Sequence, residues 1–370
     1  MRFRVERDAL ADAVAWSARS LPSRPALPLL AGLVLEVLDG TLTVAGFDYE
    51  ISTQATLDAS ADTDGRALVS GRLLAEITRS LPASPVEVAT EGARVMLRCG
   101  SARFALPTMA VSDYPELPSM PSLAGSVGSD AFAAAVSSVA VAAGRDETLP
   151  VLTGVKLSIN GAELTLAATD RYRLAVRTLP WQPVSDLGSA NALVPARTLA
   201  ESAKSLTGGA EVNISFEVGT AGAGLIGFEG GRRRTTTRLL DGDFPKYQSL
   251  MPTETAATAR LSSAALVESV RRVALVAART APVRLSFADA ELRLEAGGSD
   301  EAQASETLEV AYEGEPMTIA FNPGFLLDAL GALDSDDVAM SFTTPTKPAV
   351  LTGKDPQVYR HLLMPVRLAG

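Results

Sequence analysis

The 370-residue chain has few of the side chains that carry most enzyme chemistry. It contains one histidine, His361, and one cysteine, Cys99. A zinc site needs several histidines or thiolates, so such a site is excluded, as is an internal disulfide. The sequence therefore predicts no metal, no cofactor and no enzymatic activity, and its single thiol fits a reducing compartment.

Aromatic residues and long apolar runs are also scarce. Aromatics make up 5% of the chain, so the cores are expected to consist mainly of Leu, Val and Ala. The longest apolar run, 26–35, is interrupted by Pro28 and is far shorter than the roughly 18 residues of a membrane span. The charged residues among the first eight argue against a secretory signal. We expect a cytoplasmic protein.

The charge is acidic overall but unevenly placed. The net charge of −10 opposes tight binding to nucleic acid, which depends on Lys and Arg displacing counterions from phosphates. Basic residues nevertheless gather on or at the ends of segments with helical periodicity. If these helices share a surface, an acidic protein presents a basic face. The residues are Arg19, Arg72, Arg79, Arg145, Arg197, Lys204, Arg271, Arg272 and Arg279.

One sequence unit occurs three times. Residues 28–35 (PLLAGLVL) return as 150–157 (PVLTGVKL), and 47–49 (FDY) return as 169–171 (TDR). Residues 69–76 (VSGRLLAE) return as 194–201 (VPARTLAE), with a weaker third copy at 321–328 (FNPGFLLD). Matches that keep the same order indicate an internal repeat.

Each copy has the same plan: a helix, alternating strands, a second helix and further strands. Asp39-Gly40 and Asn160-Gly161 indicate hairpins, and Asp or Ser near the helix starts indicates N-caps. The predicted fold class is α+β, with three repeated domains at 1–120, 127–252 and 259–370, each of two helices packed on antiparallel sheets. Proline-bearing linkers are expected around 118–128 and 251–259. The predicted helices are 8–20, 71–81, 130–143, 196–206, 263–278 and 323–333.

Two further strings allow more than one interpretation. Gly222–Gly227 matches the dinucleotide-binding pattern, but an Arg/Thr strand and not a helix follows it, which favours a glycine-rich hairpin. In the basic run 232–238, Arg232, Arg234 and Arg238 would share one face of a strand. That face could bind phosphate, although a solvated sheet face is the simpler interpretation.

The two ends of the chain carry opposite charges. A strand expected at 94–104 is basic, and the third copy is acidic near residues 300–309. Opposite charges at opposite ends favour head-to-tail association. The predicted dimer interface consists of Arg98, Arg103, Leu275, Asp300, Glu301 and Glu306.

Four motifs add a family resemblance to the three-fold repeat. They are 24–29 (RPALPL), 168–174 (ATDRYRL), 243–247 (DFPKY) and 362–368 (LLMPVRL). Over its whole length the chain resembles the bacterial DNA polymerase III beta subunit, the sliding clamp. The resemblance implies a head-to-tail dimer, a closed ring of six domains that encircles duplex DNA. Twelve helices spaced by about 9 Å give a ring with a duplex-sized hole.

The same resemblance implies partners and DNA contacts. The expected partners are the DNA polymerase III alpha subunit, the clamp-loader delta subunit and other clamp-motif proteins. DNA contacts should go to phosphates, because a sliding ring must not read sequence. The family's aromatic pair is replaced by Pro150 and Val151, which puts a stacking contribution there in doubt. The DNA-facing candidates are Arg24, Arg72, Arg145, Arg197, Lys204 and Arg279.

Partners of this family insert a short linear motif into an apolar pocket between the second and third domains. Ser249 and Pro348 replace a basic and a small polar residue of some relatives, so the selectivity is expected to differ. A buried final strand is a second interpretation of 362–364, and both can hold. The matching pocket positions are Leu152, Thr169, Arg171, Tyr172, Arg173, Leu174, Pro245, Leu250, Asn322, Phe325, Leu362, Leu363, Met364, Pro365, Val366 and Arg367.

Two rival functions follow from the same residues. A monomeric peptide-binding adaptor would bind the partners without encircling DNA, and its mass in solution would be that of one protomer. An enzyme whose site matches no motif is the other rival, and it lacks candidate catalytic groups.

Overall fold

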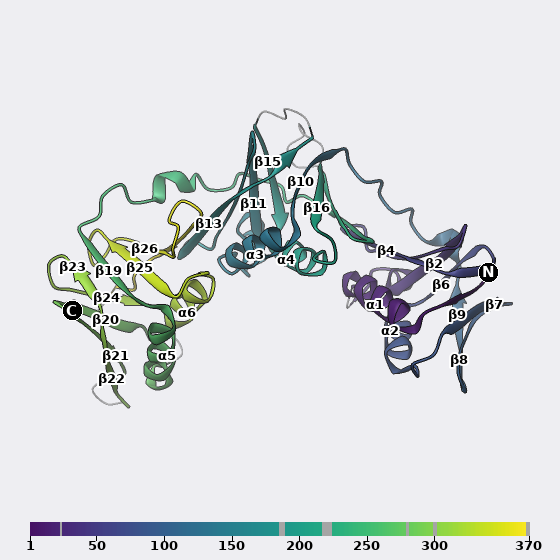
Figure 1. Cartoon of the computed structure of the whole chain (residues 1–370), viewed down its shortest axis with the longest axis horizontal. Coiled ribbons are helices and arrows are strands. Elements are labelled where there is room, and N and C mark those ends of the chain that lie inside the picture. Colours follow the sequence, from purple (N-terminus) through teal and green to yellow (C-terminus); the bar gives the residue numbers. More distant parts are fainter. Residues whose placement is uncertain (23, 185–188, 217–223, 279–280, 299–301, 368–370) are drawn as a thin grey trace. The chain divides into compact units, whose positions relative to one another are not determined.

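The structure is a computed structural model, which describes residues 1–22, 24–184, 189–216, 224–278, 281–298 and 302–367 (Figure 1). The chain forms two compact units. Unit 1 comprises residues 1–130, 182–185 and 201–239, and unit 2 comprises residues 131–181, 186–200 and 240–370. Sequence position alone does not predict this division, because the second repeat contributes strands to both units.

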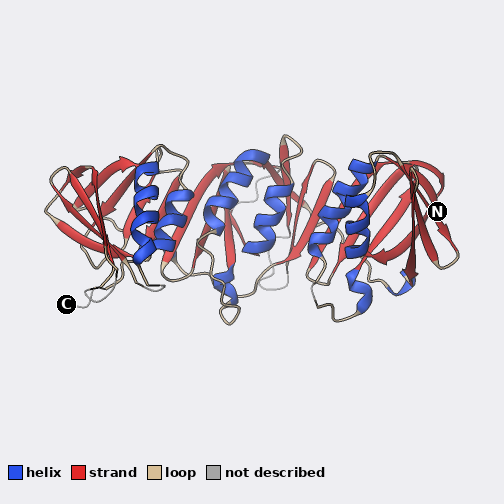
Figure 2. Cartoon of the chain, turned by 90° about the horizontal axis from the view of Figure 1, so that it is seen from below, coloured by secondary structure: helices blue, strands red, loops and turns tan. Residues whose placement is uncertain are grey.

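Unit 1 is built on one long antiparallel sheet. Helices α1 (Arg7–Ser17) and α2 (Gly71–Ser80) lie beside one another on its strands (Figures 1 and 2). In sheet order the strands are β14 (Gln182–Pro183), β10 (Leu123–Gly128), β16 (Glu211–Phe216), β17 (Leu225–Gly230), β18 (Arg233–Arg238), β4 (Ile51–Asp58), β3 (Thr41–Phe47), β2 (Gly32–Leu38), β6 (Gly65–Ser70), β9 (Ala102–Met109), β8 (Arg94–Cys99), β7 (Val86–Glu91), β1 (Arg2–Val5) and β5 (Ser60–Thr63).

Unit 2 has two antiparallel sheets and most of the remaining helices. Its helices are α3 (Ser129–Ala140), α5 (Ser263–Val273) and α6 (Pro323–Gly331), and α4 (Ala196–Ser205) spans the boundary in sequence. The larger sheet runs β15 (Ser189–Pro195), β11 (Gly154–Asn160), β12 (Glu163–Thr169), β13 (Arg173–Pro180), β27 (Tyr359–Leu363), β26 (Ala349–Thr352), β25 (Asp337–Phe342), β19 (Ala257–Ser262) and β23 (Ala311–Glu313). The smaller runs β22 (Ala304–Glu309), β21 (Glu291–Ala296), β20 (Val283–Ala288) and β24 (Met317–Phe321).

The α+β fold class and the six helices expected from periodicity are confirmed. The ends shift by a few residues, and the long first helices finish as short 3-10 turns, for example η1 (Ala18–Ser20) and η6 (Ala274–Val276). Both predicted hairpins are present, with Asp39 and Gly40 joining β2 to β3 in positive-φ conformations. No helix in the described residues has the length and apolar character that a membrane span requires.

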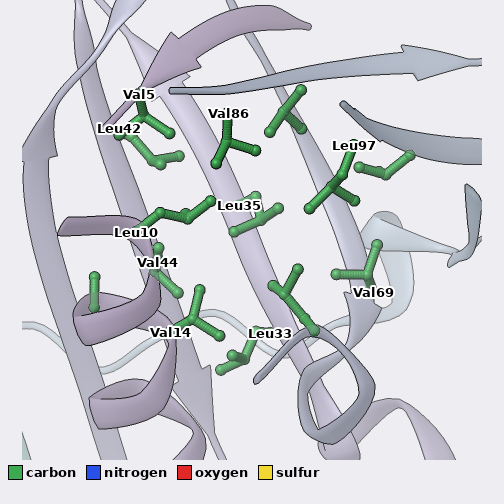
Figure 3. Packing of buried hydrophobic residues seen from close by; sticks show 14 of the residues in the cluster. Val5, Leu10, Val14, Leu33, Leu35, Leu42, Val44, Val69, Val86 and Leu97 are labelled. Atoms are coloured by element: carbon green, nitrogen blue, oxygen red, sulfur yellow. The ribbon is translucent and has the colours of Figure 1, made fainter. Parts of the chain in front are cut away.

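The expected apolar cores form without many aromatics. In unit 1 the strand β2 reads Gly-Leu-Val-Leu-Glu-Val-Leu, and Leu33, Leu35 and Val37 point into a core covered by α1 and α2 (Figure 3). Val34 faces the opposite way, into a second cluster with Phe47 and Tyr114. Because both faces of β2 are covered, the strand is almost continuously apolar.

Three local expectations were wrong. The basic strand at 94–104 is a hairpin of β8 and β9, because Gly100 adopts φ +57 and turns the chain, which places Arg98 opposite Arg103. The linker expected at 118–128 contains β10, which pairs with β16. Asp8 is not an N-cap: α1 begins at Arg7, and its N-cap Glu6 makes no side-chain capping bond.

Side chains cap other helices. The hydroxyl of Ser262 accepts a hydrogen bond from the Ala265 amide at the start of α5, and Asn322 does the same for Phe325 in α6. Each bond satisfies one of the amides that a helix start leaves without an intrahelical partner. The second cap matters for the candidate site, because it sets the position of Phe325.

Strands of neighbouring repeats pair at two places, which we name the first and second junctions. At the first junction, in unit 1, β18 pairs with β4 and Thr236 lies opposite Ser52. At the second, in unit 2, β13 pairs with β27 and Leu174 lies opposite Leu362. The two junctions are quasi-equivalent. The strand β4 of the first repeat corresponds to β13 of the second, and each pairs with the last strand of the repeat that follows, β18 or β27.

Candidate peptide-binding site

A tight turn at the second junction organises the candidate site. The Thr169 hydroxyl donates to the Arg173 carbonyl (2.6 Å) and accepts from the Arg171 amide (3.2 Å). One carboxylate oxygen of Asp170 accepts from the amides of Tyr172 and Arg173, each at 3.0 Å. Short polar side chains thus replace backbone partners in the turn and hold Tyr172 and Arg173 in place.

Arg171 has a left-handed backbone in this turn, with φ +79. Tyr49 occupies the same position of the first repeat with φ +77, and Asp48 there accepts from the amides of Glu50 and Ile51. The conformation therefore belongs to the repeated turn and is not a strain confined to a functional site.

Arg173 is the central buried charge of the site, 5% exposed. Its Nε donates to Asp170 Oδ2 (3.0 Å) and its Nη1 to Asp328 Oδ2 (2.6 Å). Its guanidinium carbon lies 4.4 Å from the centre of the Phe325 ring, a cation–π geometry. The ring of Tyr172, a residue that is 56% exposed, stacks on the same Phe325 ring, with the two ring centroids 6.3 Å apart.

These contacts show that Arg173 positions the site. Because two carboxylates already pair with its guanidinium, Arg173 is not a free cation for an acidic ligand. It orders the Phe325 ring and the turn that carries Tyr172. The two carboxylates come from different repeats, Asp170 from the second and Asp328 from the third.

An apolar cluster continues the site along the junction. Leu174 and Leu362 face one another across β13 and β27 and pack with Ala167, Val176 and Tyr247. Phe244 and Met251 add half-buried apolar surface from the segment that follows the second repeat. Burial of apolar side chains against such a surface is the main source of binding energy for a peptide anchor.

The chain after β27 is fixed by backbone hydrogen bonds. The Met364 amide donates to the Tyr172 carbonyl and the Val366 amide to the Ala320 carbonyl, both at 2.8 Å. Leu362 and Leu363 are buried, whereas Met364 is exposed. The segment is thus a buried final strand that leaves Met364 at the surface, and its place in a peptide pocket stays a prediction.

The first junction has the same turn, but its paired strands carry polar side chains, and the apolar cluster beside it consists of Val34, Phe47, Leu68 and Tyr114. Ser52 and Thr236 stand where Leu174 and Leu362 stand at the second, and their hydroxyls hydrogen-bond at 2.6 Å. The Tyr114 hydroxyl there accepts from the amide of Phe47 and donates to its carbonyl, and burial raises the pKa of Tyr114 to about 12. A hydrogen-bonded Ser–Thr pair at the first junction thus replaces the leucine pair of the second.

The structure brings together many of the predicted pocket residues. The turn 169–174, Asn322, Phe325 and the segment 362–364 are linked by the contacts above. Leu152 lies in η4 (Pro150–Thr153), Ser249 and Leu250 lie in η5 (Tyr247–Leu250), and Pro348 precedes β26. The Ser249 hydroxyl donates to the Lys246 carbonyl, and Leu250 is exposed. Pro245, Pro365 and Arg367 lie at the surface or half-buried.

Sequence reasoning missed three contributors. Asp170 and Asp328 hold Arg173, and Tyr247 packs on Leu174 and Leu362. Each stands inside a motif that the sequence displays, at 168–174, 321–328 and 243–247. Asp170 lies three residues before Arg173 in one motif, so spacing could have indicated that pair. Asp328 comes from a distant segment, and spacing cannot reveal a pair of that kind.

A buried polar chain runs along the same junction. The Tyr359 hydroxyl donates to the Ser138 carbonyl (3.0 Å), which leaves its oxygen to accept from His361 Nδ1 (2.8 Å). The other ring nitrogen, Nε2, has no partner among the described residues. Burial, with a smaller effect of the Arg173 charge, lowers the pKa of His361 to about 3, so the ring is neutral near pH 7.

This pKa predicts an acid-sensitive stability. An unfolded histidine titrates near 6.5, whereas the buried ring stays neutral down to about pH 3. Protonation therefore favours the unfolded state, and the free energy of unfolding, which is highest above pH 6.5, falls as the pH drops toward 3. At pH 5 the expected loss relative to pH 7 is about 2 kcal/mol. His361→Gln should remove most of this slope in urea unfolding measured between pH 7 and 5.

Measurement between pH 7 and 5 separates the titration of His361 from that of Glu306. Hydrogen bonds from Arg272 and Ser269 lower the pKa of Glu306 to about 2, so its contribution is lost only below its ordinary pKa of 4.5. His361 is the only histidine of the chain. An unchanged slope in His361→Gln would show that another group controls stability there.

Five of the six DNA-facing candidates are described, and all five are exposed: Arg24, Arg72, Arg145, Arg197 and Lys204. Arg24, Arg72 and Lys204 belong to unit 1, and Arg145 and Arg197 to unit 2. One Arg72 nitrogen lies 3.4 Å from the Pro22 carbonyl, on the side of α2 away from the core. Arg279 lies outside the described residues.

The predicted dimer interface is only partly described, because Asp300 and Glu301 fall outside the described residues. Arg98 and Arg103 are exposed on the β8–β9 hairpin, and Leu275 is 84% exposed just after α5. Glu306 pairs within its own chain: Arg272 donates to both of its oxygens and Ser269 to one. Its charge is therefore already matched.

The basic run 232–238 forms the first junction itself. Arg232 pairs with Asp58 (2.8 Å), Arg233 with Asp12, and Arg234 with Glu229 (2.9 Å). Arg238 donates to the Tyr49 carbonyl at 3.0 Å. Most of these partners belong to the first repeat, so the run joins repeats. Of the glycine pattern 222–227, Gly222 and Ala223 lie outside the described residues. Leu225–Gly230 form β17, which pairs with β18, so a hairpin and not a helix follows the described part of the pattern.

Among the described residues, no group of three or more His, Cys, Asp or Glu side chains is arranged to hold a metal ion. In the part of the chain that the structure describes, three copies of one α+β unit, with an apolar cluster beside an ordered aromatic pair at the second junction, define a repeat-built protein. Comparison with known proteins gives the family.

Residues 1–118, 126–246 and 248–367 match the N-terminal, central and C-terminal domains of the DNA polymerase III beta subunit. A beta sliding clamp of Streptomyces coelicolor is 54% identical over 376 residues and the match covers 100% of both chains. The sliding clamp of Bacillus subtilis has a TM-score of 0.92 at 26% identity, with 100% of both chains covered. A Pseudomonas aeruginosa clamp solved with bound griselimycin gives 0.93 at 27%, also over 100% of both chains.

The chain belongs to the DNA polymerase III beta subunit family, the bacterial sliding clamps. The resemblance inferred from the repeats and motifs is confirmed by these matches. Members of this family are non-catalytic subunits of a replicative polymerase, and the chain is accordingly not an enzyme.

Proposed function

We propose that two copies of the chain associate head to tail into a closed ring that encircles duplex DNA in the cytoplasm. The ring tethers the polymerase III alpha subunit and other replication and repair proteins through a peptide site on each protomer. The tether turns polymerase rebinding into a local event at high effective concentration, so it speeds synthesis without performing chemistry.

The proposed domains are 1–120, 127–252 and 259–370. Supporting this division, each of these segments contains two of the six helices. The compact units do not coincide with these domains, because β-sheet hydrogen bonds at each junction tie a strand of one repeat to the next.

The site at the second junction is the observation that supports partner binding. A buried arginine fixes two aromatic rings beside an apolar cluster, and the segment 362–367 borders it. A clamp of Pseudomonas aeruginosa binds griselimycin, and we propose that this chain binds the same compound at this site. Griselimycin should then compete with a peptide from the polymerase alpha subunit, and binding of both at once would contradict a shared site.

Two features support the ring. The helices carry exposed basic residues on the side opposite their cores, which suits phosphates that are contacted without base reading. The strand β22 is the edge of its sheet among the described residues, and residues 102–107 of β9 pair only with β8. Such edges accept a strand from another molecule.

Retention on circular DNA tests the ring directly. A clamp loader assembles the labelled protein on a nicked circle, the salt is raised, and the circle is then cut once. A ring stays on the circle at high salt and slides off after cutting, whereas a surface bound by charge dissociates as salt rises. A protomer mass at micromolar concentration together with salt-sensitive retention would instead support the monomeric adaptor.

A further inference from the structure

Met364 differs from the other methionines of the chain in its exposure. The structure describes all eight methionines, and Met364 is 38% exposed, whereas Met340 is fully buried. The other six are half-buried: Met1, Met96, Met109, Met120, Met251 and Met317. Because oxidation of a thioether follows its exposure, we expect peroxide to oxidise Met364 faster than the less exposed methionines.

The backbone places Met364 at the open end of the apolar cluster. Leu362 lies opposite Leu174 in the β13–β27 pair, and the Met364 amide continues the pairing by donating to the Tyr172 carbonyl. Side chains alternate along a strand, so Met364 shares the face of Leu362 and not that of Leu363. Leu362 belongs to the cluster with Tyr247, and Leu363 to a different core.

Oxidation would change this surface from apolar to polar. A peroxide transfers one oxygen atom to the methionine sulfur: the O–O bond breaks, an S–O bond forms, the thioether is oxidised to the sulfoxide, and water leaves. The sulfoxide oxygen is a strong hydrogen-bond acceptor. A peptide side chain packed against it would bury an acceptor without a partner, which lowers affinity.

We propose that Met364 is an oxidation-sensitive residue of the peptide site, whose sulfoxide releases partners from the clamp. This inference rests on the proposed function of that site. Because enzymes reduce methionine sulfoxide back to methionine, the modification forms a reversible control of partner binding by peroxide. We expect the sulfoxide to weaken peptide binding about tenfold.

The test compares matched variants of the full chain. Wild type, Met364→Leu and Met317→Leu are treated with hydrogen peroxide, and peptide mass spectrometry follows the oxidation of each methionine. Fluorescence anisotropy measures binding of a labelled peptide from the polymerase alpha subunit before and after treatment. Leucine keeps the apolar bulk and cannot be oxidised, and Met317 is a half-buried control in the third repeat.

We expect oxidised wild type and oxidised Met317→Leu to lose about tenfold in affinity, and Met364→Leu to keep its affinity. Methionine sulfoxide reductase should restore the wild type. An equal loss in Met364→Leu, or slower oxidation of Met364 than of the half-buried methionines, would overturn the inference. Met364→Gln should bind weakly without any peroxide.

The two proposals fail in different ways. If the untreated wild type does not bind the peptide, the proposed partner site is wrong, and its control by Met364 is wrong with it. If the untreated protein binds and the Met364 sulfoxide binds equally well, the peptide site stands and only the oxidation control is overturned.

Discussion

Replacing Arg173 with alanine is expected to lower the free energy of unfolding by about 2–4 kcal/mol and to weaken peptide binding about tenfold. The change leaves Asp170, whose side chain is 15% exposed, without its cation, and it removes the guanidinium that packs on Phe325. The cost stays below that of a fully buried pair, because Asp328 is half exposed and can be hydrated. Urea unfolding and peptide anisotropy measure the two effects.

Arg171→Ala is the matched control for this prediction. Arg171 lies two positions earlier in the same turn, and its side chain is exposed. We expect its loss to change stability by less than about 0.5 kcal/mol, because exposed charges contribute little. Equal unfolding midpoints for the two variants would show that the buried pairs of Arg173 do not stabilise the fold.

Leu275→Asp should abolish the ring while leaving the protomer folded. Leu275 is 84% exposed in the single chain, so its replacement removes little buried surface from the protomer. In a head-to-tail dimer each junction would bury Leu275 once. An apolar anchor lost from an interface costs about 2–4 kcal/mol, and a closed ring incurs this cost at both junctions. Sedimentation should report protomers, and retention on the circle at high salt should disappear.

Leu38→Asp is the control for Leu275→Asp, because it adds the same charge at an exposed leucine outside the predicted interface. Leu38 is 59% exposed at the β2–β3 hairpin, where no part of the predicted interface lies. This variant should sediment as wild type does and stay on the circle. If Leu275→Asp also remained dimeric, the interface would lie elsewhere and the proposed head-to-tail closure would fail.

Local order could be predicted almost completely. Apolar residues at helical spacing located the six helices, and the Asp39-Gly40 and Asn160-Gly161 pairs located the β2–β3 and β11–β12 hairpins. These patterns are reliable because a helix or strand buries one face, and its sequence must show that period. One of the three errors fell where a single glycine decides: Gly100 turns an expected strand into a hairpin.

The candidate site was predicted in its residues but not in its chemistry. Resemblance placed Arg173, Phe325 and Leu362 in one pocket. It did not show that Arg173 is held by Asp170 and Asp328, and so acts on the aromatic rings instead of on a ligand. Asp170 lies three residues before Arg173, but Asp328 lies 155 residues away, and no local pattern reports that second pair.

The sequence by itself determined the three repeats, their elements and the absence of the side chains that zinc sites require. Only the tertiary structure decided that the basic strand β18 joins two repeats, and that Leu174 meets Leu362 where Ser52 meets Thr236 at the other junction. The periodicity that forms a strand is a property of its own residues. The choice of its neighbour depends on which distant side chains bury one another best, and that choice is made only when the whole chain packs.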